Sequence, residues 1–227
     1  MEQLVRKIRF EVNEKVFLKD PENSVLGKKI VQFSILMIEE IGFESFTFKK
    51  LAEKIGSTEA TVYRYFENKH KLLIYILSWY WNWLEYLLVF STNNIPSPEE
   101  KLKIAIGIIA NPISKEDPTF GHINEIALHN IVISESSKAY LTKEVDRDNK
   151  EGYFLSYKSL CLRFAQIIKE INPKYAYAAS LASTTIEGAH HQKFFAEHLP
   201  SLSDAQIKDN NTIPKFLTEV VFKAISK

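Results

Sequence analysis

Residues 46–72 of the chain read F-T-F-K-K-L-A-E-K-I-G-S-T-E-A-T-V-Y-R-Y-F-E-N-K-H-K-L. The first half predicts a short helix that Thr47 caps, because apolar residues recur at helical spacing up to Gly56, whose permissive backbone ends it. A second helix follows almost at once, with Thr58 as its N-cap. Two helices joined by so short a turn predict a helix-turn-helix.

The second of these helices has two distinct faces. Val62 and Phe66 lie one turn apart and are predicted to face inward. The outer face then offers small, hydroxyl and cationic side chains, those of Glu59, Ala60, Thr61, Tyr63, Arg64 and Tyr65. A helix this short is not stable alone, and such a face is typical of a helix that lies in a DNA major groove.

Residues 51–72, L-A-E-K-I-G-S-T-E-A-T-V-Y-R-Y-F-E-N-K-H-K-L, resemble the signature of the TetR/AcrR family of bacterial transcriptional regulators. That signature runs roughly I-A-x-x-x-G-V-S-x-G-T-L-Y-x-Y-F-x-x-K-x-x-L, and the match has no gap. Two departures, Ser57 for the usual Val and Ala60 for the common Gly, bear on how closely the helix approaches DNA. The resemblance covers residues 26–75, and beyond them only the all-helical layout is similar.

The DNA contacts follow partly from the resemblance and partly from the outward face of the helix. We expect phosphate contacts from Thr47, Tyr63, Tyr65 and Lys69, of which Lys69 matches the phosphate-binding lysine of the family. We expect base-edge contacts from Glu59, Ala60, Thr61 and Arg64. With the cap Thr58, these residues form the predicted DNA-binding set.

Composition limits the classes of function. The chain has 227 residues, of which 45% are hydrophobic and 25% charged, so it can bury a large core. A net charge of +1 means that nucleic-acid binding requires a local basic patch and depends strongly on salt. The single cysteine, Cys161, excludes an internal disulfide and fits a reducing cytoplasm.

The most apolar run, residues 72–90, is interrupted by Ser78, Asn82 and Glu85. No basic and apolar leader precedes it. We therefore expect no secretion, no membrane span and a cytoplasmic location.

Residues 1–25 form an N-terminal extension that the resembling family lacks. Alternating apolar and polar residues predict short extended segments or a loose hairpin. One interpretation is an arm whose Arg6, Lys7 and Arg9 reach DNA. We favour a strap packed on the globule or a frayed terminus, because the five basic residues here are balanced by five acidic ones.

The rest of the chain predicts an all-α fold. No strand pattern or repeat follows residue 25, and Gly42 and the pairs Asn111-Pro112 and Asn172-Pro173 separate helical segments. Residue 152 is a glycine that predicts a break within a very long segment. The predicted helices outside the helix-turn-helix cover residues 25–41, 69–90, 99–110, 122–134, 137–171, 173–198 and 213–226. We expect a DNA-binding domain at 26–72 and a helical ligand-binding and dimerisation domain at 73–227.

The aromatic helix 69–90 raises the question of a ligand pocket. Trp79, Trp83 and Tyr86 are spaced as an aromatic box, although ordinary core packing explains the same spacing. The predicted lining is Trp79, Trp83, Tyr86, Ile106, Ile126, Phe164 and Ile168, with His129, Glu187 and His190 as polar anchors. These residues predict a small, apolar, uncharged or weakly charged effector. The alternative is a filled core without a ligand.

The sequence offers little support for a metal site or for an enzyme. Glu187 and His190 form a Glu-x-x-His pair of the kind that di-iron bundles use, but such sites need the motif twice. Phosphate loops, dinucleotide fingerprints and nucleophile elbows are missing from the sequence. We therefore expect no metal, no cofactor and no enzymatic activity.

The sequence thus predicts a ligand-responsive DNA-binding transcriptional regulator, a repressor that binds a pseudo-palindromic operator as a homodimer. The predicted dimer interface comprises residues 173–198 and 213–226, with an apolar seam of Phe216, Leu217, Val220 and Val221. One alternative is a helical interaction protein that keeps the fold without binding DNA, and another is a helical enzyme. The charge of the predicted DNA-binding domain does not distinguish these alternatives, because residues 26–72 carry eight basic and six acidic side chains.

Overall fold

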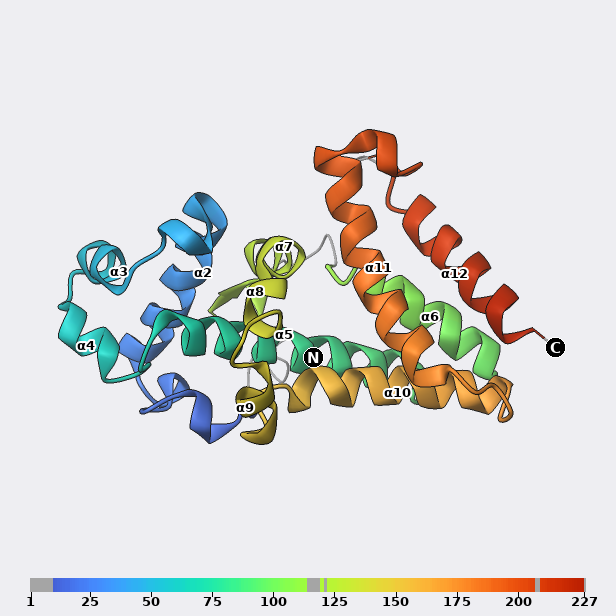
Figure 1. Ribbon diagram of the computed structural model, residues 1–227, viewed down its shortest axis with the longest axis horizontal. Helices are drawn as coiled ribbons and strands as arrows, with labels where there is room; N and C mark the ends of the chain where they lie inside the picture. Colours follow the sequence, from blue (N-terminus) through green and yellow to red (C-terminus); the bar gives the residue numbers. More distant parts are fainter. Residues whose placement is uncertain (1–9, 114–118, 121, 207–208, 227) are drawn as a thin grey trace. The chain divides into compact units, whose positions relative to one another are not determined.

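The computed structural model describes residues 10–113, 119–120, 122–206 and 209–226. Helices dominate these residues (Figure 1), which confirms the predicted all-α class. A short antiparallel ladder pairs β1, Thr119–Phe120, with β2, Ile123–Asn124. The prediction that no strand follows residue 25 is therefore wrong at this hairpin, which is too short to show a periodic pattern in sequence.

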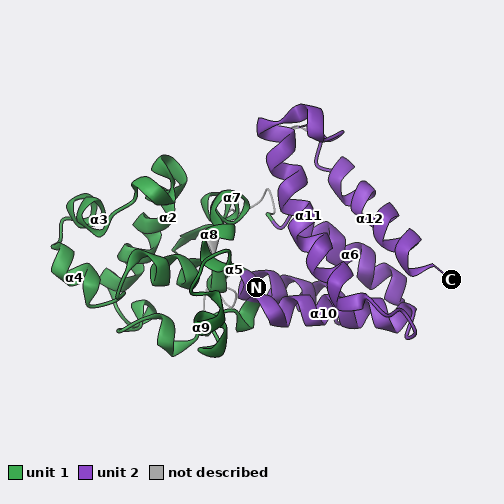
Figure 2. Cartoon of the chain, viewed as in Figure 1, with its two compact units in different colours: residues 1–80, 113–156 green, residues 81–112, 157–227 purple. Residues whose placement is uncertain are grey.

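The chain divides into two compact units (Figure 2). Unit 1 comprises residues 1–80 and 113–156, and unit 2 comprises residues 81–112 and 157–227. Helix α5, Lys69–Thr92, contributes its first half to unit 1 and its second half to unit 2. These are units of packing, so the functional boundaries predicted after residues 25 and 72 remain predictions.

Unit 1 begins with the strap that precedes the first long helix. Two 3-10 turns, η1, Glu14–Val16, and η2, Pro21–Asn23, replace the predicted extended segments or hairpin. Asn13 and Asp20 cap these turns with their side chains, a local bond that the alternating pattern did not reveal. The predicted arm of Arg6, Lys7 and Arg9 lies outside the described residues.

Helix α2, Val25–Ser45, starts at the cap Ser24, whose hydroxyl accepts the Gly27 N–H at 2.9 Å. Gly27 is needed there, because a Cβ would lie 2.3 Å from the Pro21 carbonyl oxygen. At Gly42 the backbone leaves helical geometry with φ 75°, and the helix resumes briefly to Ser45. The predicted end at residue 41 thus marks a kink in a longer helix.

Helix α3, Phe48–Ile55, and helix α4, Glu59–Tyr63, form the predicted helix-turn-helix. Thr47 accepts the Lys50 N–H at 3.2 Å and Thr58 accepts the Thr61 N–H at 3.3 Å, so both predicted caps are confirmed. Gly56 ends α3 in the left-handed region with φ 67°. The inner residues Phe48, Leu51, Ala52, Ile55, Val62 and Phe66 are all buried.

The remaining helices of unit 1 are α7, Glu125–Glu135, α8, Ser137–Tyr140, and α9, Val145–Lys150. Helix α7 packs against α2. The predicted helix 137–171 is in fact α8, α9 and α10, Leu155–Ile171. Gly152, with φ 80°, lies in the break before α10 as predicted, but the turn between α8 and α9 carries no glycine or proline and was missed.

Unit 2 contains the second half of α5 with α6, Pro98–Ala110, α10, α11, Ala178–His198, η3, Pro200–Leu202, and α12, Thr212–Ile225. Helices α6, α11 and α12 pack against one another. Helix α11 starts five residues later than the predicted Pro173, because residues 173–177 form a turn.

Helix α5 is long and apolar enough to cross a membrane by length and composition. However, 72% of its most apolar window is buried inside the protein. Trp81 and Trp83 are among the buried side chains. Such burial is typical of a core helix of a folded protein.

Candidate DNA interface

The outer face of α4 presents the residues predicted to read bases. Thr58, Glu59, Ala60 and Arg64 are exposed, Tyr63 is 47% exposed and Thr61 is half-buried. Val62 in the same turn is buried against the interior of unit 1. The predicted division of this helix into an outer and an inner face is confirmed for these residues.

Tyr65 does not belong to that outer face. Its side chain is only 3% exposed, and its hydroxyl shares a 2.8 Å hydrogen bond with the Ser24 hydroxyl. Helix α4 ends at Tyr63, and the Tyr65 N–H bonds the Val62 carbonyl at 2.9 Å, so the chain turns back toward the interior. The prediction that Tyr65 faces outward is wrong, because helical spacing was extended past the end of the helix.

Lys69 lies at the first position of α5 and holds the end of α2. Its ammonium donates to the carbonyl oxygens of Phe43 at 3.0 Å and Glu44 at 3.1 Å, and lies 3.4 Å from that of Phe46. It also lies 4.7 Å from the centroid of the Phe43 ring. Lys69 therefore caps unpaired carbonyls of α2, and its predicted phosphate contact remains a prediction.

A buried carboxylate also holds the kink at Gly42. Glu135, at the end of α7, accepts the Phe43 N–H on Oε1 at 3.1 Å. Its other oxygen forms a 2.6 Å ion pair with Lys138, and this hydrogen bond raises the pKa of Lys138. Sequence reasoning missed Glu135, because its partner lies 92 residues away and no local pattern marks the pair.

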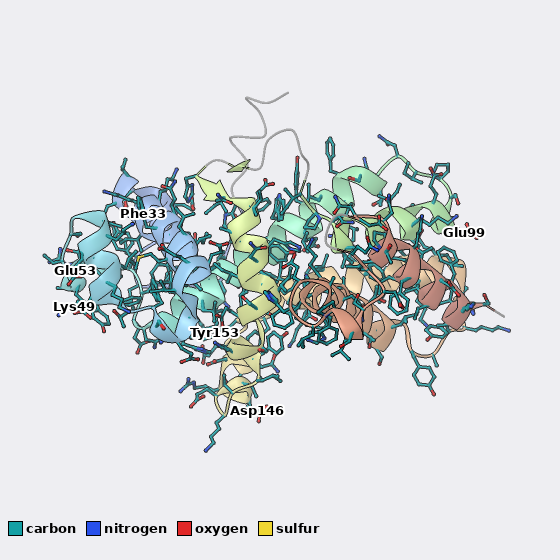
Figure 3. The ribbon with its side chains drawn as sticks, turned by 90° about the horizontal axis from the view of Figure 1, so that it is seen from above. Phe33, Lys49, Glu53, Glu99, Asp146 and Tyr153 are labelled. Carbon is teal, nitrogen blue, oxygen red and sulfur yellow. The ribbon has the colours of Figure 1, made fainter. Side chains whose placement is uncertain are left out.

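Helix α3 carries exposed cations close in sequence to α4, which we call the recognition helix. Lys49, Lys50 and Lys54 are all exposed, and Lys50 donates to the Ser45 carbonyl at 2.8 Å. The side chains of Lys49 and Glu53 lie at the outer edge of α3 (Figure 3). Sequence reasoning did not select these lysines, although their position opposite the apolar stripe of α3 identifies them as exposed.

The predicted ligand-binding residues are divided between the two units. Trp79, Ile126 and His129 belong to unit 1, and Ile126 is 47% exposed, which excludes it from a buried lining. The others belong to unit 2, namely Trp83, Tyr86, Ile106, Phe164, Ile168, Glu187 and His190. Trp79 and Trp83 lie one turn apart on α5, and the boundary between the units falls between them, so the ligand pocket predicted from these residues remains a prediction.

In unit 1, His129 and Tyr80 form a buried pair. The Tyr80 hydroxyl and His129 Nδ1 share a 2.7 Å hydrogen bond, and their rings stack with centroids 5.8 Å apart. Burial raises the pKa of Tyr80 well above its usual value, so this hydroxyl stays protonated. The pair satisfies polar atoms within the core of unit 1.

In unit 2, Glu187 and His190 meet aromatic residues that sequence reasoning did not select. The Tyr157 hydroxyl donates to Glu187 Oε1 at 2.6 Å. The Trp81 ring lies 4.6 Å from that of Tyr157 and 5.6 Å from that of His190, measured between centroids. Burial lowers the pKa of His190 to about 4, so its ring is neutral at pH 7. We call Trp81, Tyr157, Glu187 and His190 the aromatic cluster.

One cavity of unit 2 has a volume of about 320 Å³. It lies beside the end of α11 and the start of α12, and its lining is Gln192, Ser201, Leu202, Ser203, Asp204, Ala205, Thr212, Ile213 and Phe216. None of the predicted ligand-binding residues lines it. Among the described residues, no group of three or more metal-ligating side chains gathers in one place.

Helix α12 divides the predicted dimer seam in two. Phe216 and Val220 lie one turn apart and are 48% and 42% exposed. Leu217 and Val221 lie on the neighbouring face and are buried in unit 2. Of these four residues, only the first pair is available to a second copy of the chain, so Leu217 and Val221 do not belong to the predicted apolar seam.

The residues of the candidate DNA interface match a known protein family in sequence. The sequence model of the family described as bacterial regulatory proteins, tetR family, matches residues 35–76. This match runs from within α2 through α3 and α4 into α5. No curated protein matches the chain in sequence.

Several solved structures are similar to this chain at low identity. The fatty acid degradation regulator FadR from Bacillus halodurans is 18% identical, with a TM-score of 0.59 over 85% of this chain and 92% of that one. AibR in complex with isovaleryl coenzyme A and operator DNA is 14% identical, with a TM-score of 0.57 over 86% and 98%. The superantigen PfiT is 15% identical, with a TM-score of 0.58 over 90% and 97%. At such identities the likeness shows the fold alone.

Proposed function

We propose that this chain regulates transcription by reading DNA through α4, because the sequence model of the tetR family of bacterial regulatory proteins matches residues 35–76. The observation that carries the proposal is the outer face of α4 and its two ends. Thr58, Glu59, Ala60 and Arg64 are exposed there and Thr61 is half-buried, while Val62 on the inner face is buried. Such a protein works in the cytoplasm, and the proposal assigns it no enzymatic activity, cofactor or metal.

The two kinds of DNA contact have different sources. Arg64 presents a fork of N–H donors that matches a guanine edge, and Glu59 and Thr61 offer shorter polar groups beside it. Thr47 and Tyr63 are exposed, and the proposal assigns them to phosphate contacts. Lys49, Lys50 and Lys54 extend the positive charge along α3 and support binding to the backbone.

A gel shift with the DNA that flanks its own gene tests this function. We expect specific retardation that weakens steeply as salt rises, because phosphate contacts release counterions. The same fragment with its sequence shuffled serves as the control. No retardation at low salt would instead favour the helical interaction protein.

We further propose that the chain binds its operator as a homodimer. Two half-sites one helical turn apart, about 34 to 36 Å, require two copies of α4 in a symmetric assembly. Residues 173–198 and 213–226 are the proposed interface, and the exposed Phe216 and Val220 supply its apolar contact.

The solution mass tests this interface. The double variant Phe216→Asp with Val220→Asp should be monomeric at micromolar concentration, because it places charges in a desolvated contact. Leu162→Asp is the matched control, since Leu162 is 61% exposed on α10 outside the proposed interface. A monomeric wild type, or a double variant that stays dimeric, would refute the assignment.

The proposed signal is a small apolar effector that releases the protein from DNA. An effector shifts DNA binding only if it binds one state better than the other. AibR holds isovaleryl coenzyme A and FadR regulates fatty acid degradation, which supports an effector with an acyl or similar apolar part. In this chain the aromatic cluster offers apolar rings with one carboxylate, Glu187, and one neutral imidazole, His190.

Native mass spectrometry of the purified protein tests for such an effector. A bound compound that is lost in Glu187→Ala, and that weakens DNA binding when added back, would support the aromatic cluster as its site. Burial of Trp83 and Phe164 supports the alternative of a filled core for these two residues. A compound retained in Glu187→Ala would refute this site.

A further inference from the structure

Residues 10–24, which we call the strap, precede α2 and pack on unit 1. Val16 is fully buried, and the Phe17 ring lies edge-on to the Tyr75 ring with centroids 6.0 Å apart. Phe10 meets Trp79 in the same way at 5.0 Å. These contacts hold the strap on the surface of α5 within unit 1.

Polar contacts fix the middle of the strap. Asn13 Nδ2 donates to the Glu151 carbonyl at 2.8 Å, and the Lys15 ammonium bonds the Glu151 carboxylate at 2.7 Å. The Lys15 carbonyl accepts from Lys71 Nζ at 3.2 Å and from the Tyr153 hydroxyl at 3.4 Å. Bonds to α5 and to the turn after α9 therefore determine where the next residues of the strap lie.

Those next residues surround Tyr65. The Leu18 N–H donates to the Tyr65 carbonyl at 2.8 Å, which is a backbone bond across 47 positions of sequence. The Tyr65 hydroxyl bonds Ser24, and the Lys19 ammonium lies 5.1 Å from the centroid of its ring. The strap thus contacts Tyr65 at its carbonyl, its hydroxyl and its ring.

Tyr65 connects the strap to the recognition helix. Its N–H bonds the Val62 carbonyl at 2.9 Å, and Arg64 lies between these two residues. Helix α4 spans only Glu59–Tyr63, too short to keep its conformation without support at both ends. Thr58 caps its start, and Tyr65 fixes its end.

We propose that the strap positions the recognition helix: Leu18 and Ser24 hold Tyr65, and Tyr65 sets the direction in which α4 presents Arg64. Leu18, Ser24 and Tyr65 are positioning residues, because they act on DNA recognition through α4. The proposal rests on the function proposed above, in which α4 reads DNA. It gives the N-terminal extension a role that does not require the extension to contact DNA.

Leu18→Pro removes the hydrogen bond from the Leu18 N–H to the Tyr65 carbonyl and changes little else. The Leu18 side chain is 64% exposed, so the residue acts mainly through its N–H, which proline lacks. The preceding Phe17 has φ −132° and ψ 158°, which a residue before proline readily adopts. Leu18→Ala is the matched control, since it removes the exposed side chain and keeps the N–H.

We expect Leu18→Pro to bind the operator about three- to tenfold more weakly, the effect of losing one positioning hydrogen bond. Its affinity for random DNA should stay unchanged, because phosphate contacts tolerate a small change in direction. Leu18→Ala should match the wild type on both DNAs. If the folded Leu18→Pro protein keeps its operator affinity, or loses affinity equally on random DNA, the proposal is overturned.

If Leu18→Pro does not fold, Tyr65→Phe tests whether the strap positions α4. It removes only the hydroxyl that bonds Ser24 and keeps the buried ring. Operator affinity should fall about threefold with random binding unchanged, as expected for one neutral hydrogen bond. Unchanged operator affinity in Tyr65→Phe would overturn the proposal.

Amide hydrogen exchange separates this proposal from the function on which it rests. In Leu18→Pro, or in Tyr65→Phe if the proline variant does not fold, the amides of Tyr65 and Phe66 should exchange faster, while those of α10 keep the wild-type rate. This readout needs no DNA. A wild type without specific DNA binding would refute the proposed function alone, whereas unchanged exchange at Tyr65 and Phe66 would overturn the strap's role.

Discussion

At the scale of the residue, Arg64 is the side chain on which the proposed base recognition depends most. It is exposed and follows the last residue of α4. If Arg64 reads a guanine, Arg64→Ala should cost about 1 to 3 kcal/mol of operator binding and relax the preference at one base position. Equal losses on operator and random DNA, measured by fluorescence anisotropy, would reduce Arg64 to a phosphate contact.

Lys69 provides the contrast to Arg64. Sequence reasoning predicts that Lys69→Ala weakens binding to all sequences alike. The structure adds a second consequence, because this ammonium holds carbonyl groups at the end of α2. The melting temperature of the variant must therefore be measured beside its DNA affinity, and comparisons of affinity belong well below that temperature.

His190 predicts a dependence of stability on pH. Burial lowers its pKa from 6.5 to about 4, so the unfolded chain takes up a proton before the folded one does. The contribution of His190 to stability is then fully present above pH 6.5 and is lost as pH falls toward 4. Urea unfolding from pH 7.5 down to 4.5 should show this loss, and His190→Gln should lessen it.

The neighbouring His191 supplies the control for this experiment. His191 is exposed and is the smaller cause of the lowered pKa of His190, after burial, so His191→Gln should change the pH dependence much less than His190→Gln. A His190→Gln variant with the same pH dependence as the wild type would contradict the assignment of this effect to His190.

Tyr65 and Val62 illustrate what residue-level reasoning predicts. Val62 was correctly predicted to be buried, because it lies within α4 and helical spacing applies there. Tyr65 lies beyond the end of the helix, where spacing carries no information about direction. Its buried side chain depends on Ser24, 41 positions earlier, which no local pattern reveals.

At the scale of the element, the kink of α2 at Gly42 depends on α7. Glu135→Ala leaves the Phe43 N–H buried without its acceptor, which should lower the free energy of unfolding by about 1 to 3 kcal/mol. Glu135→Gln keeps an oxygen that can accept this bond and should cost less. Urea unfolding of the three proteins measures the difference, and an alanine variant as stable as the wild type would contradict the role of Glu135.

Element boundaries were predictable where a local signal exists. The starts of α3 and α4 follow from Thr47 and Thr58, whose side chains bond the first turns. The division of residues 137–171 into three helices was only partly visible, because Gly152 marks one break and no breaker residue marks the other. The two 3-10 turns of the strap depend on the side-chain caps of Asn13 and Asp20. The alternation of apolar and polar residues gives no sign of these caps.

At the scale of the whole molecule, the fold class followed from sequence, while the division of the predicted ligand-binding residues between two units did not. Periodicity says which face of a helix is apolar, but the partner of that face depends on how the chain packs. Trp79 and Trp83 are one turn apart on α5 and still belong to different units. Trp81 and Tyr157, in contrast, meet across 76 positions of sequence and escaped prediction.

A footprint of this protein on the DNA that flanks its gene tests whether the chain is a dimeric, sequence-reading regulator. We expect protection of two half-sites whose centres lie about 10 to 10.5 base pairs apart, or a multiple of this, on a pseudo-palindromic sequence. The protection should disappear with Arg64→Ala at protein concentrations that saturate the wild type. Uniform or absent protection at low salt would contradict the claim.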